Sequence, residues 1–441
     1  MPDHPNIAVV VLDTLRYDTF DEFFDWIPGT SFTNAYSTSH WTVPAHGSLF
    51  TGLYPSEVGV HSQSLSLDCD EPTIAEELHG SGYYTRKYTA NLNIHLWDGW
   101  DRGFEKNIGP DELVSYYDTD TLDFSKFLSQ SDGSGLSLYL SAISECIKGE
   151  HSTIYSLLDG TRRYFESKKR GGAKSVLRQL EDETFDDREF IFINLMDVHV
   201  PYYPPKEYRT LSKEVSTNNW EPFVGDISNL SDAKIAYNDA ASYLSDMYKK
   251  IFSKLNEDFD YILTLSDHGE MLGEFDMIDH TYGVYPQLSH IPLVISGGDV
   301  TESTIDVPVS ILDVHATIAD LAGIECQTHG QILLNDPQAK NRLVEYHGFL
   351  PWLKERFVEK GVPEETYEEL NQPLHACVNK DGNYSFETHS DGLIVEDGLQ
   401  HQEARRNIDS LVSQLTVREV STDNSSVEDP VMDRLEDLGY A

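Results

Sequence analysis

Residues 6 to 12, Asn-Ile-Ala-Val-Val-Val-Leu, form a continuous β-branched run that ends directly on Asp13. A β-branched run of this length is typical of a strand that is buried on both faces of a parallel sheet. Three more runs have the same character, at 189–195, 260–265 and 291–296. Helical patterns alternate with them near 73–80, 174–182, 231–255 and 309–322. The alternation predicts an α/β fold, with a mainly parallel, doubly wound sheet flanked by helices.

The length of 441 residues allows one large domain and a smaller one. We expect the large domain over residues 1–340. Within it, residues 107–188 carry mixed helical periodicity, several Gly-Ser breaks and no strong strand, which predicts a helical insertion. Residues 341–441 are expected to form a small C-terminal α+β subdomain, with strands and a helix at 374–378, 383–387 and 402–415.

Acidic residues dominate the charge of the chain. Asp and Glu number 75 against 32 Lys and Arg, which gives a formal net charge of −43. The acids are spread from Asp3 to Asp437, and 11% aromatic residues with clear apolar periodicity exclude wholesale disorder. Because an anionic protein repels nucleic acid, we expect no nucleic-acid partner. The charge predicts a halophilic protein, since in molar salt the screening length falls to ~3 Å and self-repulsion no longer opposes compaction.

The cysteines indicate a reducing compartment. Only four occur, without a C-x-x-C pair or a short metal-type spacing, at Cys69, Cys146, Cys326 and Cys377. Residues 1–20 lack a basic start followed by an apolar core, and no run approaches the ~18 apolar residues that a membrane span needs. We therefore expect a cytoplasmic protein without a membrane span; the sequence leaves its oligomeric state open.

Polar side chains stand directly after the predicted strands. Asp13 follows the first, Asp197 and His199 follow the second, and Ser-Asp-His-Gly-Glu at 266–270 follows the third. Ligands of open α/β sheets gather beyond the carboxyl ends of the strands. We therefore expect Asp13, Asp197 and Asp267 at one edge, with the Asp13 and Asp267 carboxylates within about 8 Å, close enough to share a cation.

The segment 41–52, Trp-Thr-Val-Pro-Ala-His-Gly-Ser-Leu-Phe-Thr-Gly, predicts a short helix with Pro44 in its first turn and Gly52 at its end. Thr42 then lies at the helix N-terminus, where backbone donors favour an anion. A plain threonine cap is the commoner outcome for such a residue. Together with Asp13, Asp267 and His268, however, Thr42 completes a set of oxygen and imidazole donors suited to a divalent metal.

These segments resemble the sulfatase family of the alkaline phosphatase superfamily, in a haloarchaeal type. The cues cover nearly the whole chain, at 6–18, 32–55, 82–104, 197–202, 265–270 and 435–440. The resemblance implies that residues 1–340 are a catalytic domain that hydrolyses sulfate or phosphate esters. It also implies that the carboxylates of Asp13 and Asp267 and the imidazole of His268 bind the metal.

One departure from the family concerns the nucleophile. Familiar sulfatases carry Cys-x-Pro-Ser-Arg, or Ser for Cys, and oxidise the first residue to a formylglycine whose hydrate attacks sulfur. Here the tract is Thr-Val-Pro-Ala-His at 42–46, and threonine is not a substrate for that oxidation. A threonine alkoxide instead suits the phosphate-handling branches, where it would attack phosphorus and leave a phosphothreonine. The prediction is a metal-dependent hydrolase of phosphate or sulfate esters with Thr42 as nucleophile.

Four side chains are candidates for proton transfer or substrate contact: His199, His280, His46 and Arg16. Histidine suits protonation of a leaving alkoxide because its pKa lies near about 6.5, and cationic groups stabilise charge on the ester oxygens. His199 and His280 fall where the family places basic substrate-binding residues, and Asn91 falls near another such position. A turn histidine is as good an interpretation of His280.

The donors predict one divalent metal, with Ca²⁺, Mg²⁺ or Mn²⁺ favoured and Zn²⁺ left open by the imidazole. The expected substrate is a small-molecule or glycan ester. Two other functions remain open. The first is a transferase that moves a phosphoryl or phospho-alcohol group to a glycan or lipid acceptor. The second is a non-catalytic binding protein, which the intact set of Asp13, Thr42, Asp267 and His268 argues against.

Overall fold

The computed structural model describes most of the chain, over residues 4–110, 113, 172–213, 215, 217–225, 227–396 and 398–420. The predicted insertion at 107–188 lies largely outside these residues, as does the family-like ending at 435–440. Two described elements fall in this range: β5 (Lys106–Ile108) overlaps its start, and α9 (Ala173–Asp182) lies near its end.

An eight-stranded sheet forms the centre of the molecule, in the order β12-β2-β11-β7-β1-β6-β4-β5. Its strands are β1 (Ile7–Leu12), β2 (Thr30–Phe32), β4 (Tyr84–Thr89), β5, β6 (Glu189–Leu195), β7 (Tyr261–Leu265), β11 (Leu293–Gly297) and β12 (Ser303–Ile305). β1 pairs in parallel with both β6 and β7, and β4 pairs in parallel with β6 and β5. β11 runs antiparallel to β7 and to β2. The predicted fold class is confirmed, with one strand reversed.

Successive residues of β1 pack into two different cores. Ile7, Val9 and Val11 belong to one apolar cluster, while alternate residues between them belong to the other. All six β1 residues are buried, at roughly 1.5–3 kcal/mol for each large aliphatic side chain. This two-sided burial explains the unbroken apolar run in the sequence.

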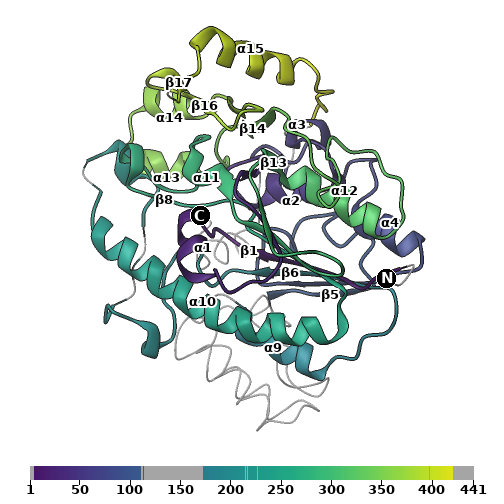
Figure 1. The fold of residues 1–441 in the computed structure, drawn as a ribbon. Coiled ribbons are helices and arrows are strands. Elements are labelled where there is room, and N and C mark those ends of the chain that lie inside the picture. The colour runs from purple at the N-terminus through teal and green to yellow at the C-terminus, as the bar shows by residue number, and fades with distance from the viewer. Residues whose placement is uncertain are drawn as a thin grey trace, which may run out of the picture.

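Helices cover both faces of the sheet (Figure 1). One core includes residues of α2 (Thr42–Thr51), α4 (Ile74–Gly80) and α12 (Ile311–Leu321). The other includes residues of α1 (Tyr17–Phe23), α9 and α10 (Leu230–Asp258). Among the described helices, none is both long and apolar enough to cross a membrane.

The C-terminal part forms a small antiparallel sheet in the order β14-β15-β16-β17. Its strands are β14 (Arg342–Tyr346), β15 (Leu374–Val378), β16 (Tyr384–Thr388) and β17 (Gly392–Val395). The helices of this part are α13 (Leu353–Lys360), α14 (Glu364–Leu370) and α15 (His401–Val412). Figure 1 shows α15 lying over this sheet, away from the central one. A small C-terminal subdomain is thus present; the boundary at residue 340 stays a prediction.

Short elements complete the described fold. β3 (Ala35–Tyr36), β10 (His290–Ile291) and β13 (Val309–Ser310) make a three-stranded sheet, and β8 (Met271–Leu272) pairs with β9 (Ile278–Asp279). The one-turn helices are α3 (Pro55–Val58) and α11 (Pro286–Ser289), and the 3₁₀ turns are η1 (Lys206–Tyr208), η2 (Glu221–Phe223) and η3 (Glu274–Asp276).

Candidate active site

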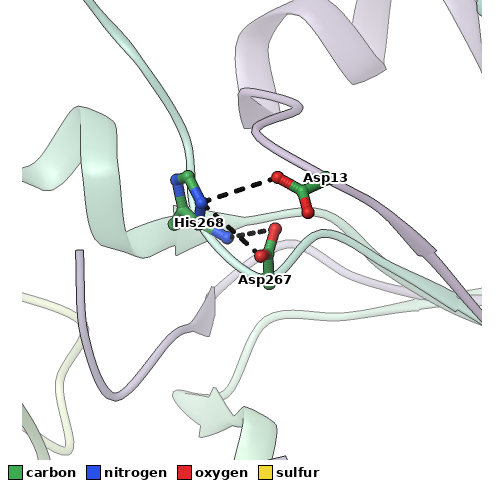
Figure 2. A group of neighbouring side chains, drawn as sticks. All are labelled: Asp13, Asp267 and His268. Carbon is green, nitrogen blue, oxygen red and sulfur yellow. Dashed lines mark hydrogen bonds and ion pairs between the residues drawn. The ribbon is translucent and has the colours of Figure 1, made fainter. Parts of the chain in front are cut away.

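Asp13, Asp267 and His268 meet at the carboxyl ends of the paired strands β1 and β7 (Figure 2). All three are fully buried, and one donor atom from each lies within 4.8 Å of the others. His268 Nε2 is 3.7 Å from Asp13 Oδ1 and 3.5 Å from Asp267 Oδ2. The expected closeness of the two carboxylates is therefore found. Strand pairing causes it, because Asp13 and Asp267 each stand just past the end of neighbouring parallel strands.

The histidine of this cluster presents a lone pair to the two carboxylates. His268 Nδ1 lies 2.9 Å from the Gly269 carbonyl oxygen, which can only accept, so we assign the ring proton to Nδ1. Burial, and then the nearby His280, hold the pKa of His268 well below its usual value, which keeps the ring neutral. A neutral imidazole whose second nitrogen is held by a carbonyl is the usual form of a metal-binding histidine.

The two carboxylates conflict without a cation between them. Burial, and then the charge of Asp13, raise the pKa of Asp267 well above its usual value. Asp267 Oδ2 is buried and accepts no hydrogen bond from the described residues. A bare carboxylate oxygen at this depth costs free energy, and a divalent cation would satisfy it while offsetting both charges. Two carboxylates and one imidazole thus fit such an ion chemically.

Two asparagines orient Asp13. Its Oδ2 accepts hydrogen bonds from Asn91 Nδ2 at 2.8 Å and from Asn194 Nδ2 at 2.9 Å, which leaves Oδ1 on the side of His268. The sequence reasoning missed Asn194. It is the one polar residue inside the apolar run Phe-Ile-Phe-Ile-Asn-Leu at 190–195, and that interruption was the signal.

Thr42 is the first residue of α2 and lies beside the cluster. Its Oγ1 is 3.3 Å from His268 Nε2 and 3.3 Å from Asn91 Nδ2. Trp41 occupies the cap position, so the alternative of a plain threonine cap is not what the structure has. Pro44 lies in the first turn and Gly52 ends the helix with a left-handed φ of 72°, as predicted.

His46 supports the start of α2 from one turn further along. Its Nδ1 lies 2.9 Å from the Thr42 carbonyl oxygen and 3.6 Å from Asp267 Oδ2. The ring packs edge-on against Phe50 and Phe192, and burial lowers the pKa of His46 to about 4. His46 therefore contacts the site through Asp267 and the backbone of Thr42; its predicted catalytic role stays a prediction.

His199 and His280 face each other beside His268. Their ring centroids are 4.9 Å apart, and the His280 ring is 4.7 Å from that of His268. Burial opposes protonation of His280, but the charges of Glu270 and Asp279 outweigh it and raise the pKa of His280 to about 9. Burial and then His280 lower the pKa of His199 to about 4. The structure thus sets a cationic and a neutral imidazole side by side.

Glu270 was quoted in the sequence motif without a role, and the structure gives it one. Its carboxylate oxygens lie 3.3 and 3.4 Å from His280 Nδ1, and Tyr202 donates a hydrogen bond to Oε2 at 3.0 Å. The carboxylate is fully buried, so its interaction with His280 is strong. The two residues stand at the two ends of the short β8–β9 hairpin, and the sequence gave no signal for that hairpin.

Two expected site residues make other contacts. Arg16 donates to both oxygens of Asp18 at 2.9 and 2.6 Å and forms a further ion pair with Glu274 at 3.0 Å. This pairing competes with the predicted contact of Arg16 with substrate, which stays a prediction. Asp197 accepts a hydrogen bond from the Ala173 backbone N–H at 3.0 Å, so this carboxylate holds the start of α9. Asp197 follows β6, which pairs in parallel with β1, so it lies at the predicted edge of the sheet, but its carboxylate does not join the three-residue cluster.

The sheet, with acidic, imidazole and hydroxyl groups past its central strands, has an alkaline phosphatase-like fold, and the family match reported next places the chain among the ester hydrolases. Residues 5–324 match the model of the sulfatase family, and the chain belongs to that family. Divalent metal binding is a property of this superfamily.

Three relatives illustrate the range of the match. An uncharacterized sulfatase of Escherichia coli (strain K12) is 22% identical over 388 residues, which span 78% of this chain and 74% of that protein. A choline-sulfatase of Rhizobium meliloti (strain 1021) is 23% identical over 372 residues, 73% of this chain and 68% of that one. The structure of a phosphonate monoester hydrolase from Silicibacter pomeroyi superimposes with a TM-score of 0.60 at 16% identity, and covers 93% of this chain and 94% of that chain. The last likeness shows the fold.

Proposed function

We propose that this protein hydrolyses phosphate or sulfate esters of small molecules or glycans, with Thr42 as the nucleophile and one divalent metal. Asp13, Asp267 and His268 would hold the metal. The observation that carries the proposal is the position of the Thr42 hydroxyl, 3.3 Å from the lone-pair nitrogen of His268. The hydroxyl lies beside the proposed metal donors and makes no helix-capping hydrogen bond, which favours a role as nucleophile.

These positions support a reaction in two steps. A cation bound here would lower the pKa of the Thr42 hydroxyl and offset the negative charge of the ester oxygens. Thr42 Oγ1 then forms a bond to phosphorus as the bond to the alcohol oxygen breaks, and its proton passes to solvent. Water cleaves the phosphothreonine in a second step, which releases phosphate and restores the hydroxyl. Asn91 holds Thr42 Oγ1 and Asp13 in place for both steps.

The departing alcohol oxygen needs a proton, and His280 and His199 lie beside the site, where His280, with its raised pKa, carries the proton to give. Their rings contact each other, and the ring of His280 also contacts that of His268. Glu270 fixes the orientation of His280 through its carboxylate. We assign proton transfer to this pair, and the stabilisation of charge on the ester to the imidazoles and the N-terminus of α2.

Phosphorus is the better centre for this nucleophile. A formylglycine hydrate can expel sulfate by elimination, because it keeps a second hydroxyl, whereas threonine has one hydroxyl and offers no such route. A phosphothreonine is hydrolysed by in-line attack of water. The relatives include a choline-sulfatase and a phosphonate monoester hydrolase, so their names do not decide between sulfate and phosphorus esters.

A substrate panel tests the proposal. The panel consists of four aryl esters: a phosphate monoester, an alkyl phosphodiester, a phosphonate monoester and a sulfate. Each is supplied in molar KCl with Mg²⁺, Mn²⁺, Ca²⁺ or Zn²⁺, and release of the phenol is followed. We expect metal-dependent turnover of at least one phosphorus ester, faster than that of the sulfate. Turnover that persists at full rate in Thr42→Ala would contradict the proposal. Products formed with and without added alcohols separate hydrolysis from transfer.

A further inference from the structure

Thr14, the residue after Asp13, has an unusual backbone conformation. Its φ is 65°, in the left-handed region that residues branched at Cβ rarely adopt. The residue is fully buried, at the carboxyl end of β1. A residue stays in such a conformation only where the surrounding structure fixes it, and residues of this kind cluster at functional sites. The contacts of Thr14 show what the conformation achieves.

Thr14 donates one hydrogen bond to each of the two buried carboxylates of the candidate metal site. Its hydroxyl donates to Asp13 Oδ1 at 2.9 Å, and its backbone N–H donates to Asp267 Oδ1 at 3.2 Å. Rotation about φ sets where a side chain lies relative to its own N–H, and at 65° both donors reach the site. A single residue thus connects two carboxylates that stand 254 positions apart in the chain and repel each other when both are ionised.

The hydrogen bonds around these carboxylates leave one oxygen of each on the side of His268. Asp267 Oδ1 also accepts from the His268 backbone N–H at 3.0 Å, whereas Asp267 Oδ2 accepts no hydrogen bond from the described residues. Asp13 Oδ2 is occupied by the two asparagines, so Oδ1 keeps a lone pair beside the single bond that it accepts from the Thr14 hydroxyl. The two remaining oxygens, Asp13 Oδ1 and Asp267 Oδ2, lie 3.7 and 3.5 Å from His268 Nε2.

Groups from two other elements hold Thr14 in place. The Tyr237 hydroxyl, on α10, donates to the Thr14 carbonyl oxygen at 2.8 Å and accepts from the Arg16 backbone N–H at 2.9 Å. Ser266, directly after β7, accepts a hydrogen bond at its Oγ from the Leu15 backbone N–H at 3.0 Å. The turn that follows β1 is therefore fixed to α10 and to the end of β7, and this fixing sustains the left-handed conformation of Thr14.

We propose that Thr14 is a positioning residue for the metal: its hydroxyl and its N–H turn the two carboxylates so that one oxygen of each faces His268. The inference rests on the metal site of the proposed function, and it assigns a role to a residue that contacts the ligands and not the metal. Without these donors the two buried charges would turn apart. The cation would then have to bring the carboxylates together as it binds, which lowers its affinity.

Calorimetric titration with Mn²⁺, in molar KCl and without substrate, tests the proposal. Thr14→Val keeps the shape and the branching at Cβ but removes the hydroxyl, whereas Thr14→Ser keeps the hydroxyl. We expect the Kd for Mn²⁺ to rise about tenfold or more in Thr14→Val, the usual effect of removing a group that orients a metal ligand, and to stay within about twofold of the wild type in Thr14→Ser. Titration of Asp267→Asn gives the background of Mn²⁺ bound elsewhere on the acidic surface.

Two further variants separate positioning from folding. Thr317→Val removes another fully buried threonine hydroxyl, one that donates to the Asp313 carbonyl oxygen in α12, and should leave the Kd unchanged. Thr14→Gly removes the Thr14 hydroxyl and suits a left-handed φ, so its backbone is free of strain where that of Thr14→Val is not. Its Kd should rise as in Thr14→Val. Melting curves of the metal-free proteins identify the variants that fold.

The visible spectrum of bound Co²⁺ distinguishes a positioning residue from a ligand, because its bands depend on the number and arrangement of the ligands. The spectrum of Thr14→Val should match that of the wild type, and a changed spectrum would mean that Thr14 itself binds the metal. An unchanged Kd in both Thr14→Val and Thr14→Gly, or an equal loss in Thr14→Ser, would overturn the role of Thr14 and leave the metal site standing. Failure of the wild type to bind Mn²⁺ above the Asp267→Asn background would overturn the metal of the proposed function itself.

Discussion

The hydroxyl oxygen of Thr42 lies 3.3 Å from Nε2 of His268, although 226 residues separate them in the chain. Two features bring them together. β7 ends just before His268, and α2 begins at Thr42, so a strand end and a helix start point at one place. The Gly269 carbonyl then turns the lone pair of His268 toward the hydroxyl. The proposed nucleophile and a proposed metal donor are thus adjacent in a site with fully buried carboxylates.

Replacing Thr42 should separate catalysis from folding. Thr42→Ala removes the proposed nucleophile, and we expect turnover to fall by at least about a thousandfold, because loss of a nucleophile costs far more than loss of a contact. Thr42→Ser keeps a hydroxyl and should retain part of the activity. Kinetics of the two variants with the best ester of the panel check this. Thr51→Ser, a buried change later in the same helix, controls for packing, and equal melting midpoints would show that the fold is intact.

Metal binding should stabilise the protein through Asp267. Saturating Mn²⁺ is expected to raise the melting midpoint of the wild type, since a ligand that binds only the folded state adds about 2.7 kcal/mol at a hundred times its Kd. Asp267→Asn should lose most of this shift. Asp197→Asn is the matched control, because that carboxylate is also buried after a central strand but holds the start of α9. An equal loss of the shift in both variants would argue against a metal between Asp13 and Asp267.

Glu387 should make the C-terminal part sensitive to acid. Burial raises the pKa of this carboxyl, but hydrogen bonds from His375 and Arg405 outweigh it and lower the pKa to about 2. A lowered pKa in the folded state contributes stability above the unfolded value near 4.5, and this stability is lost as the pH falls toward 2. Since the group is half-buried, we expect Glu387→Gln to cost about 1–2 kcal/mol at pH 7 and less at pH 3.

Melting curves at the two pH values measure this effect. Glu355→Gln removes the same charge from an exposed position on α13, and so corrects for the general relief of repulsion in an acidic protein. An equal change in both variants at both pH values would mean that the contacts of Glu387 add nothing.

The sequence predicts the central sheet of this molecule well. Its central strands are buried on both faces, and such strands need apolar side chains at successive positions. The ranges 6–12, 189–195 and 260–265 agree with β1, β6 and β7 to within a residue. The same reasoning predicted that Asp13, Asp267 and His268 lie close together, since the carboxyl ends of paired parallel strands meet at one edge of the sheet. The reversed direction of β11 could not be predicted, because an apolar run has the same pattern in either direction.

Other parts of the site depend on contacts that no local pattern records. Arg16 reads as a free cation near the first aspartate, yet Asp18, two residues away, already binds it. Asp197 reads like Asp13 and Asp267, yet a backbone N–H at the start of α9 turns its carboxylate aside. The pairing of Glu270 with His280 depends on the two-residue strands β8 and β9, which are too short to be recognised in the sequence. Such partners are set by tertiary packing, and residue type alone does not reveal them.

Stability should rise with salt. The formal charge of −43 makes the folded chain repel itself, and the screening length falls from ~10 Å at 0.1 M to ~3 Å at 1 M salt. We therefore expect the melting midpoint to increase from roughly 0.1 to 3 M KCl, most steeply below about 1 M, where screening of the repulsion changes most. Thermal melts over this range measure it. A flat or falling midpoint would contradict the predicted adaptation to a salt-rich cytoplasm.

Restoring the family's modified residue would show whether the site still accepts sulfate. Thr42→Cys alone produces Cys-Val-Pro-Ala-His, which lacks the arginine of the Cys-x-Pro-Ser-Arg tract, whereas Thr42→Cys with His46→Arg provides it. With a formylglycine-generating enzyme supplied, we expect the aldehyde to form in the double variant, and peptide mass measurement detects it. Its hydrate has the second hydroxyl that threonine lacks, so a sulfated intermediate can be expelled by elimination. The converted variant should therefore hydrolyse an aryl sulfate faster than the wild type does.

His46 is fully buried between aromatic rings, so a melting curve must first show that the double variant folds. A folded, converted variant without sulfatase activity would mean that parts of the site other than the nucleophile exclude the sulfate ester.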